Sequence, residues 1–324
     1  MIKVGIVGYG NLGRGVNIAV NNASDMQLVG IFTRRDPSNI TPVEKCNVYS
    51  IDKLSEFKGK IDVLLLCGGS ATDLPQNTKN YLKDFNTVDS FDTHAKIPEY
   101  FAELDKIAKE NNTLGLISVG WDPGIFSITR TLFSSVLPNG EYYTFWGKGA
   151  SQGHSDAIRR IEGVKKAIQY TIPKEDALRK VREGINPSLT TREKHLRECF
   201  VVVKDGADKA SIEEQIKTMP NYFADYDTIV NFIDEERFDL EHGKLPHGGF
   251  VIHTGNTTKE NSEVLELSLK LDSNPEFTGS VLTAFARALV KMKSEGKVGA
   301  ITVLDVPIGY LSPNSMEYLR KRLV

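Results

Sequence analysis

The chain has 324 residues, 40% hydrophobic and 25% charged, with a net charge of −2, which excludes an electrostatic reason to expect nucleic-acid or membrane partners. No apolar run approaches the roughly 20 residues that span a bilayer, and the first strand is predicted from residue 2, so we expect no signal peptide. Cys46, Cys67 and Cys199 are widely spaced and odd in number, which favours reduced thiols in a cytoplasmic protein.

The first predicted strand, residues 2–7, runs directly into the pattern G-x-G-x-x-G at Gly8, Gly10 and Gly13. A helix over residues 14–20 and a strand over residues 27–32 complete a βαβ unit. The first glycine allows a tight turn, the second lets the backbone approach a pyrophosphate, and the third allows close helix packing. The helix N-terminus then offers free N–H groups to phosphates. The pattern predicts a dinucleotide site, although such a turn alone could be structural.

The end of the second strand indicates which dinucleotide binds. NAD sites usually carry an acidic residue about twenty positions past the glycines, for the ribose 2′-hydroxyl. Here Thr33, Arg34 and Arg35 occupy that place. Two guanidinium groups suit a 2′-phosphate, and Arg34 could also stack on adenine, so we predict NADP(H). The alternative is a pair of solvated arginines, because Asp36 and Pro37 end the strand here.

The next elements also alternate between strands and a helix. Strands are predicted at residues 63–67, 87–90 and 114–118, with a helix at residues 97–110. Each strand ends in a polar or glycine-rich segment, and ligands of open parallel sheets lie beyond these carboxyl ends. The pattern predicts an α/β fold, with a Rossmann-type doubly wound parallel sheet.

Beyond about residue 140 the pattern changes to longer strands with fewer helices, typical of an α+β domain with a mixed sheet and helices on one face. A long helix at residues 276–295 and the tail at 313–323 are expected to return to the first domain. We therefore expect residues 1–120 plus 275–324 to bind NADP and residues 121–274 to form a second domain. The strands expected there cover residues 142–146, 195–203, 228–233, 250–253 and 264–271, and the helices 174–183 and 210–218.

Asp92 and Asp122 each follow a strand of the first domain and are the strongest candidates for chemistry. Two carboxylates near the nicotinamide could hold a substrate ammonium, and one could accept a proton as the amine becomes an iminium. The alternatives are a cap on the following segment for Asp92 and a turn carboxylate before Pro123 for Asp122.

Aromatic and polar residues beside other strand ends could line the same pocket. Trp121 and Trp146 both flank glycines, although tryptophan is as often a core residue. Residues 151–156 form a polar loop entering a helix whose amides could bind a carboxylate, and Ser155 could equally be an N-cap.

Arg197 lies within a predicted strand, on the same face as Cys199, where a planar guanidinium could bind a carboxylate. The alternative is an ion pair with Glu198 or Glu193. His247 lies in a tight turn that could aim its ring into a pocket. No cysteine lies near it, so we expect no metal site.

Taken together, these motifs resemble the meso-diaminopimelate D-dehydrogenase family nearly from end to end. The blocks GWDPG at residues 120–124 and SQGHSDA at residues 151–157 are far more specific than the glycine pattern. Further matching segments lie at residues 7–14, 69–73, 89–94, 145–147, 169–171, 197–200, 219–222 and 246–249.

The resemblance implies a reversible oxidative deamination. The D-configured carbon of meso-2,6-diaminopimelate loses hydride to NADP⁺, and the imine is hydrolysed to L-2-amino-6-oxopimelate and ammonia. It implies two groups of substrate-binding residues. The group at the reacting D-centre is Asp92, Trp121, Asp122, Trp146, Gln152 and Gly153, with the two aspartates as catalytic residues. The group at the distal L-centre is Thr171, Arg197, His247 and Asn274.

The resemblance also implies a homodimer formed through the middle domain, in bacterial lysine and cell-wall precursor metabolism. The only partner expected besides a second copy is the small-molecule substrate. The residues expected to bind NADP are Gly8, Tyr9, Gly10, Asn11, Leu12, Gly13, Thr33, Arg34, Arg35, Cys67, Gly68, Gly69, Ser70, Thr72, Ser90, Phe91, Asp92, Trp121, Asp122 and Pro123.

Two other functions compete with this one. A sugar or imine oxidoreductase of similar layout would use a lysine or histidine as acid/base, and Lys96 would fit that role. A redox-sensing regulator would bind NADP without chemistry, which would leave Asp92, Asp122 and Arg197 idle. Turnover of alcohols would favour the first, and NADP binding without turnover the second.

Overall fold

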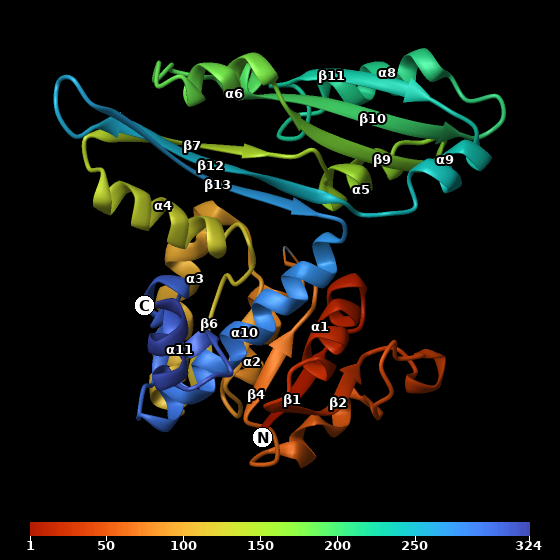
Figure 1. Ribbon diagram of the computed structural model, residues 1–324. Coiled ribbons are helices and arrows are strands. Elements are labelled where there is room, and N and C mark those ends of the chain that lie inside the picture. The colour runs from red at the N-terminus through yellow and green to blue at the C-terminus, as the bar shows by residue number, and fades with distance from the viewer. Residues whose placement is uncertain (71) are drawn as a thin grey trace. The chain divides into compact units, whose positions relative to one another are not determined.

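The chain divides into two units, residues 1–128 with 275–324 and residues 129–274 (Figure 1). The computed structural model describes residues 1–70 and 72–324, so Ala71 in the segment 69–73 lies outside the described residues. The chain passes from the first unit to the second inside helix α4 (Ile125–Val136). It returns to the first unit between Asn274 and Pro275.

The first unit contains one seven-stranded sheet. Its strands are β1 (Ile2–Val7), β2 (Met26–Thr33), β3 (Val48–Ser50), β4 (Val63–Leu66), β5 (Thr87–Asp89), β6 (Leu114–Leu116) and β14 (Gly299–Ile301). They are parallel, in the order β14-β6-β5-β4-β1-β2-β3. The order reverses between β1 and β4, the switch point at which such sheets bind ligands. The doubly wound parallel sheet expected from the sequence is confirmed.

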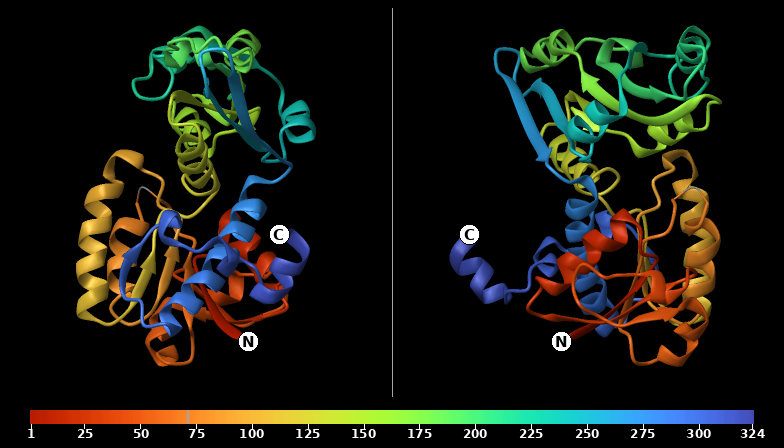
Figure 2. Two further views of the ribbon diagram at one scale, coloured as in Figure 1. Left: turned by 60° about the vertical axis from the view of Figure 1, so that its left-hand side comes forward. Right: turned by 90° about the vertical axis from the view of Figure 1, so that its right-hand side faces the viewer.

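Helices cover both faces of this sheet (Figures 1 and 2). One face packs on α1 (Asn11–Asn21) and α10 (Asn274–Ser294), and the other on α2 (Leu74–Tyr81) and α3 (Ile97–Glu110). Strand β4 shows why its sequence is continuously apolar: Leu65 enters the first core, whereas Leu64 and Leu66 enter the second. The C-terminal helix is α11 (Met316–Leu323).

The second unit contains two sheets where the sequence had suggested one. Its strands are β7 (Gly140–Trp146), β8 (Gly149–Ala150), β9 (Val164–Pro173), β10 (His195–Val203), β11 (Asp227–Phe232), β12 (His247–Asn256) and β13 (Ser262–Leu271). A mixed sheet has the order β11-β10-β9-β8, and an antiparallel sheet the order β13-β12-β7. The chain changes sheets at Gly147, whose φ of +114° and closeness to the Thr171 carbonyl exclude a side chain.

Helices pack on both faces of the mixed sheet, not on one face as expected. The remaining helices are α5 (Gln152–Arg159), α6 (Glu175–Arg182), α7 (Thr191–Lys194), α8 (Lys209–Thr218) and α9 (Glu235–Glu241). Residues of α5 and α8 share a core with Cys199 and Val201, whereas Phe238 of α9 packs with Phe200 on the opposite face. Helix α6 packs against β7 and β12. None of the described helices has the length and apolarity to cross a bilayer.

Candidate functional site

The glycine turn after β1 leaves backbone exposed where a phosphate would bind. Gly8 has a φ of +92°, and a Cβ at Gly13 would lie 2.4 Å from the Gly8 carbonyl oxygen. A Cβ at Gly10 would meet nothing within 4 Å, so this side of the turn is open. Gly10 begins α1 without any side-chain cap, and the first turn holds no acidic residue. Its N–H groups are therefore available to an anion.

The two arginines after β2 are held in different ways. The Arg35 guanidinium donates to the carbonyl oxygen of Tyr9, and the Arg35 backbone N–H donates to Thr33 Oγ1 at 3.1 Å. Arg34 forms an ion pair with Asp73 at 3.0 Å. Arg35 thus lies at the glycine turn and Arg34 at the loop after β4. Guanidinium groups at these two places fit a 2′-phosphorylated ribose.

A pocket in the first unit extends from the glycine turn toward α2. Seven of its residues were not expected in a site from the sequence: Val7, Phe32, Ile51, Leu66, Leu74, Asn77 and Tyr81. Asn77 and Tyr81 are four positions apart on one helix, which is the only signal that could have paired them. A mostly apolar pocket with one amide and one guanidinium suits an adenine ring. The residues lining it are Val7, Gly8, Phe32, Arg34, Ile51, Leu66, Gly68, Leu74, Asn77 and Tyr81.

The segments after β4 and β5 are joined by side-chain hydrogen bonds. Asp92 accepts from Ser70 Oγ at 2.5 Å, and the Asp92 backbone N–H donates to the same oxygen at 2.9 Å. Asp73 accepts from the Gly69 N–H at 3.0 Å. Cys67 is buried, and burial raises the pKa of its thiol to about 12, so it packs as a small apolar residue.

Asp89, at the end of β5, is fully buried, and the sequence did not predict a role for it in the site. Its Oδ1 accepts from the N–H groups of Phe91 and Ser118, both at 3.0 Å. Its Oδ2 accepts from Tyr100 at 2.7 Å and Thr78 at 3.3 Å. Burial raises the pKa of this carboxyl, and these donors oppose the rise. Asp89 thereby fixes the two loops that lead to Asp92 and Asp122.

The functional aromatic residues expected in the first unit are held by their neighbours. Trp121 is buried and meets Phe126 edge-to-face at 5.3 Å, so it serves partly as a core residue. The side chains of Tyr9 and Phe91 are also buried: the Tyr9 hydroxyl donates to Asn17, and the Phe91 ring packs on Tyr100.

In the second unit, Arg197 is a buried cation without a carboxylate. It is 6% exposed, its guanidinium donates to Thr171 Oγ1, and its Cζ atom lies 3.8 Å from the centre of the Tyr226 ring. Its Nε has no hydrogen-bond partner, and no described carboxylate pairs with it. The expected alternative, an ion pair with Glu198 or Glu193, is therefore wrong: Glu198 faces the other side of the strand, and Glu193 caps α7.

Three histidines near Arg197 are neutral at physiological pH. Burial and the Arg197 charge lower the pKa of His154 to about 4 and that of His195 to about 3, and also lower the pKa of His247. The His247 ring packs directly on Gly149, where a Cβ would lie 2.4 Å from the ring. Arg197 is thus the one fixed positive charge in this group of described side chains.

Trp146 is supported by His195. The backbone N–H of Trp146 donates to His195 Nε2 at 2.9 Å, and the indole and imidazole rings stack with centres 5.4 Å apart. His195 was not expected as a site residue, because a histidine at the start of a strand carries no such signal in the sequence.

Gln152 and Gly153 form the exposed first turn of α5. The helix begins after Ser151, so the expected alternative of an N-cap at Ser155 is wrong: Ser155 lies inside the helix and bonds the Ser151 carbonyl. No side chain caps this turn, which leaves its N–H groups for a ligand. Asn274 is anchored by its backbone N–H, which donates to the Leu245 carbonyl at 2.9 Å.

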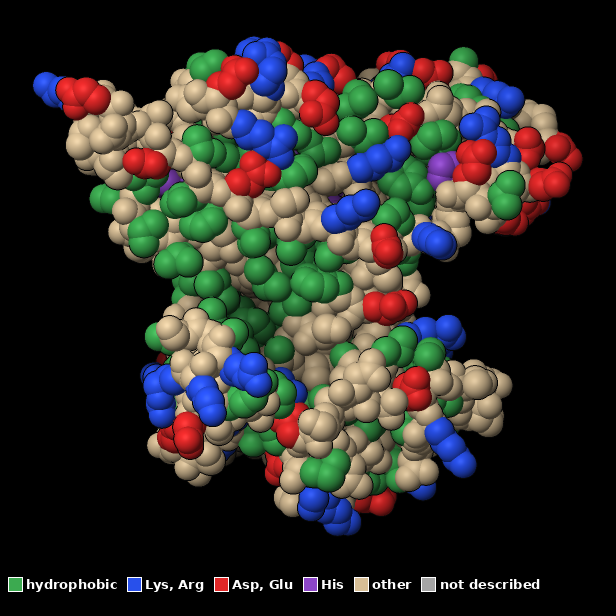
Figure 3. Space-filling view, viewed as in Figure 1, with side chains coloured by type: hydrophobic (Ala, Val, Ile, Leu, Met, Phe, Trp, Pro, Cys, Tyr) green, Lys and Arg blue, Asp and Glu red, His purple; other side chains and the backbone are tan. Residues whose placement is uncertain are grey.

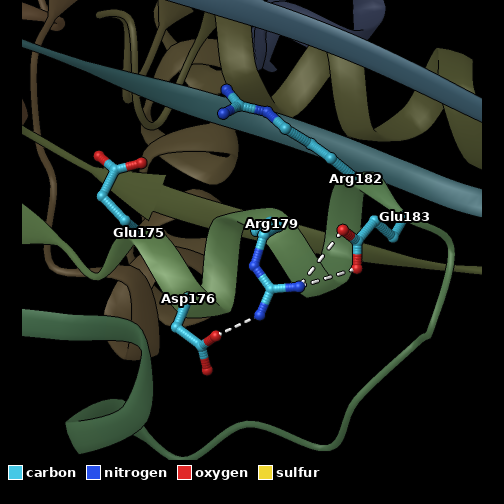
Figure 4. Close-up of a pocket in the computed structure, with 5 residues that line it drawn as sticks. All are labelled: Glu175, Asp176, Arg179, Arg182 and Glu183. Atoms are coloured by element: carbon cyan, nitrogen blue, oxygen red, sulfur yellow. Dashed lines mark hydrogen bonds and ion pairs between the residues drawn. The ribbon is translucent and has the colours of Figure 1, made fainter.

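A hollow on the surface of α6 is lined by charged side chains only (Figure 4). It is lined by Glu175, Asp176, Arg179, Arg182 and Glu183, none of which was expected in a site. Arg179 pairs with Asp176 at 2.6 Å and with Glu183 at 3.2 Å, and Arg182 pairs with Glu266 at 2.8 Å. Its cations are already paired, so it has the character of a solvated surface.

Comparison with known proteins identifies the family. Residues 120–273 match the model of the diaminopimelic acid dehydrogenase C-terminal domain. Meso-diaminopimelate D-dehydrogenase of Lysinibacillus sphaericus is 56% identical over 323 residues, covering 100% of this chain and 99% of that protein. The chain belongs to the meso-diaminopimelate D-dehydrogenase family. The resemblance drawn from the motifs is confirmed.

Solved structures of this family have the same fold. The DAP dehydrogenase of C. glutamicum in complex with DAP is 48% identical, with a TM-score of 0.93 over 100% of this chain and 99% of that chain. An engineered D-amino acid dehydrogenase bound to NADP⁺ is 46% identical, with a TM-score of 0.88 over the same shares. One of these two structures thus holds DAP and the other holds NADP⁺.

Proposed function

We propose that this chain is an NADP-dependent oxidoreductase that deaminates the D-centre of meso-2,6-diaminopimelate, giving L-2-amino-6-oxopimelate and ammonia in a reversible reaction. The observation that carries this function is the buried, uncompensated Arg197 in a chain of the meso-diaminopimelate D-dehydrogenase family. A buried cation is costly unless an anion compensates it, and a diacid supplies that anion.

NADP⁺ is the cofactor, and when bound it supplies the hydride acceptor. The open glycine turn, the uncapped N-terminus of α1 and the two arginines would hold its phosphates. The adenine ring would occupy the pocket that contains Asn77 and Tyr81. We assign cofactor binding to the first unit and most of the substrate binding to the second unit, while Asp92, Trp121 and Asp122 of the first unit also bind substrate.

Asp92 and Asp122 would bind the reacting D-amino group, and one of them would take a proton as the imine forms on the substrate. Trp121 and Trp146 would exclude bulk water from this carbon, while the N–H groups at Gln152 and Gly153 would bind the adjacent carboxylate. Thr171, Arg197, His247 and Asn274 would bind the distal L-centre. Fixing the distal end in this way selects the D-carbon as the one that reacts.

We also propose a homodimer through the second unit, in the cytoplasm. Exposed apolar side chains support such an interface: Leu132 and Val136 on α4 are 55% and 61% exposed, and Tyr142 on β7 is 55% exposed. Hydrophobic side chains also show between charged ones on the face drawn in Figure 3. Light scattering of the purified protein tests the dimer, and Val136→Glu should yield monomers.

The proposed reaction is tested by incubating the protein with NADP⁺ and meso-diaminopimelate. We expect NADPH and ammonia in equal amounts. In Asp122→Ala, kcat/KM should fall by about a hundred-fold or more while NADP⁺ affinity is kept. Absence of NADPH formation by the unmodified protein, or near-normal turnover by the variant, would contradict the reaction or the role of Asp122, respectively.

A further inference from the structure

Gln169, Thr171 and Arg197 form a buried polar group on one face of the mixed sheet. Strands β9 and β10 pair Thr171 with Arg197 and Gln169 with Cys199, and alternate residues of a strand share a face. Gln169 is 0% exposed, Thr171 4% and Arg197 6%. Gln169 is therefore part of the layer that contains Thr171 and Arg197, the proposed distal-carboxylate residues.

The direction of the Thr171 hydroxyl is fixed by two neighbouring donors. Gln169 Nε2 donates to Thr171 Oγ1 at 3.4 Å, and Arg197 Nη1 donates to the same oxygen. A threonine hydroxyl has two acceptor sites and one proton. Both acceptor sites are occupied, so the hydroxyl can only donate, and none of the described residues accepts its proton. The Thr171 hydroxyl proton is therefore available to an acceptor outside the protein.

The same group has further unused hydrogen-bonding capacity. Gln169 Oε1 and Arg197 Nε are both buried, and neither has a partner among the described residues. Unpaired buried polar atoms are costly, and here two of them lie beside a hydroxyl that is forced to donate. The donor groups, a hydroxyl and a guanidinium, match the two oxygens of a carboxylate.

We infer that Gln169 is a positioning residue for substrate selection: by donating to Thr171, its amide orients the threonine hydroxyl toward the distal carboxylate of the diacid. This role rests on the proposed function and names a residue that acts through Thr171 without touching the substrate. A glutamine is required because a carboxylate at this position would accept the hydroxyl proton, and an apolar side chain would leave the hydroxyl free to rotate.

The test is a double-mutant cycle on kcat/KM for meso-diaminopimelate, with Gln169→Met, Thr171→Val and the double variant. We expect Gln169→Met to lower kcat/KM roughly ten-fold through a higher KM, with kcat nearly kept. In the Thr171→Val background the same change should have almost no effect, because the hydroxyl that it orients is gone. Gln169→Glu should lower kcat/KM more than Gln169→Met.

Cys199→Ala is the matched control, because Cys199 faces Gln169 across the strand pair and belongs to the apolar core. It should lower the melting temperature without raising the KM. Equal effects of Gln169→Met with and without Thr171, or an unchanged KM in Gln169→Met and Gln169→Glu, would overturn the role of Gln169. Turnover of meso-diaminopimelate by the unmodified protein separates that failure from a failure of the proposed function.

Discussion

Asp89 and Arg197 are both buried charged side chains, one in each unit, but the protein completes the hydrogen bonding of only one of them. Asp89 receives four hydrogen bonds, two from backbone N–H groups and two from hydroxyls. Arg197 contacts Thr171 and Tyr226, and its Nε is unpartnered. A complete set of partners indicates a structural charge, whereas an incomplete set indicates one that a ligand completes.

The largest expected effect concerns Arg197. In Arg197→Met, kcat/KM for meso-diaminopimelate should fall on the order of a thousand-fold, because the distal carboxylate loses its buried cation. The melting temperature should rise, because an uncompensated buried charge is replaced by an apolar side chain. Steady-state kinetics and thermal unfolding measure both effects. Kept activity, or a lower melting temperature, would place Arg197 among the structural charges.

Replacing Asp89 should lower the stability of the protein, whereas replacing Arg197 should raise it. In Asp89→Leu, the buried N–H groups of Phe91 and Ser118 lose their acceptor, and the free energy of unfolding should fall by about 3 kcal/mol. Asp89→Asn keeps an acceptor for both N–H groups and should lose less. Chemical denaturation measures the difference. If Asp89→Leu is as stable as the unmodified protein, Asp89 is not a structural charge.

A control for Asp89 lies elsewhere in the same unit, where Asp25 pairs with Arg287 at 2.6 Å. This pair is distant in sequence from the loops of Asp92 and Asp122. Asp25→Asn should also reduce stability but leave kcat unchanged. Asp89→Leu should reduce both, because it frees those loops.

A smaller effect is expected at Arg35, which is proposed to bind the 2′-phosphate. Arg35→Asp should raise the KM for NADP⁺ roughly ten-fold to a hundred-fold, since a charged hydrogen bond becomes a repulsion. The KM for NAD⁺ should change much less, and NAD⁺ is therefore the internal control. Equal losses for both cofactors would refute the phosphate assignment.

The most gradual effect is a pH dependence of stability that comes from the neutral histidines beside Arg197. The folded pKa values of His154 and His195, about 4 and about 3, lie below the ordinary value of 6.5. Below pH 6.5 the unfolded chain gains protons that the folded protein does not, so stability falls between pH 6.5 and pH 4. Each histidine should contribute about 1 kcal/mol per pH unit over most of this range.

Denaturant unfolding at several pH values measures that slope, and His195→Gln should reduce it. His94→Gln, which changes an exposed residue of the other unit, should leave the slope unchanged. A slope that is the same in His195→Gln as in the unmodified protein would mean that His195 is not the group that titrates.

Local patterns predicted much of this molecule. The bounds of α3 and β10 match the expected ranges, because an amphipathic period and a strand alternation are contiguous in sequence. The glycine turn and Arg197 were found in the same way. The expected distal group also includes Thr171, which the structure pairs with Arg197.

Other features depend on contacts that no local pattern contains. Asp89 looks like any acidic residue at a strand end, and its partners come from α2, α3 and the segment after β6. Strand β9 was not predicted, and Gln169 becomes notable only when β9 pairs with β10. The neutral state of His195 likewise follows from burial beside Arg197, which a sequence does not display.

The most direct measurement is NADP⁺ reduction with the meso, LL and DD isomers of diaminopimelate, each at equal concentration. If Arg197 and its neighbours bind an L-configured end, the meso isomer should react fastest, the DD isomer poorly and the LL isomer not at all. Equal rates with the meso and DD isomers, or any turnover of the LL isomer, would contradict the claim that the buried cation selects the substrate by its distal end.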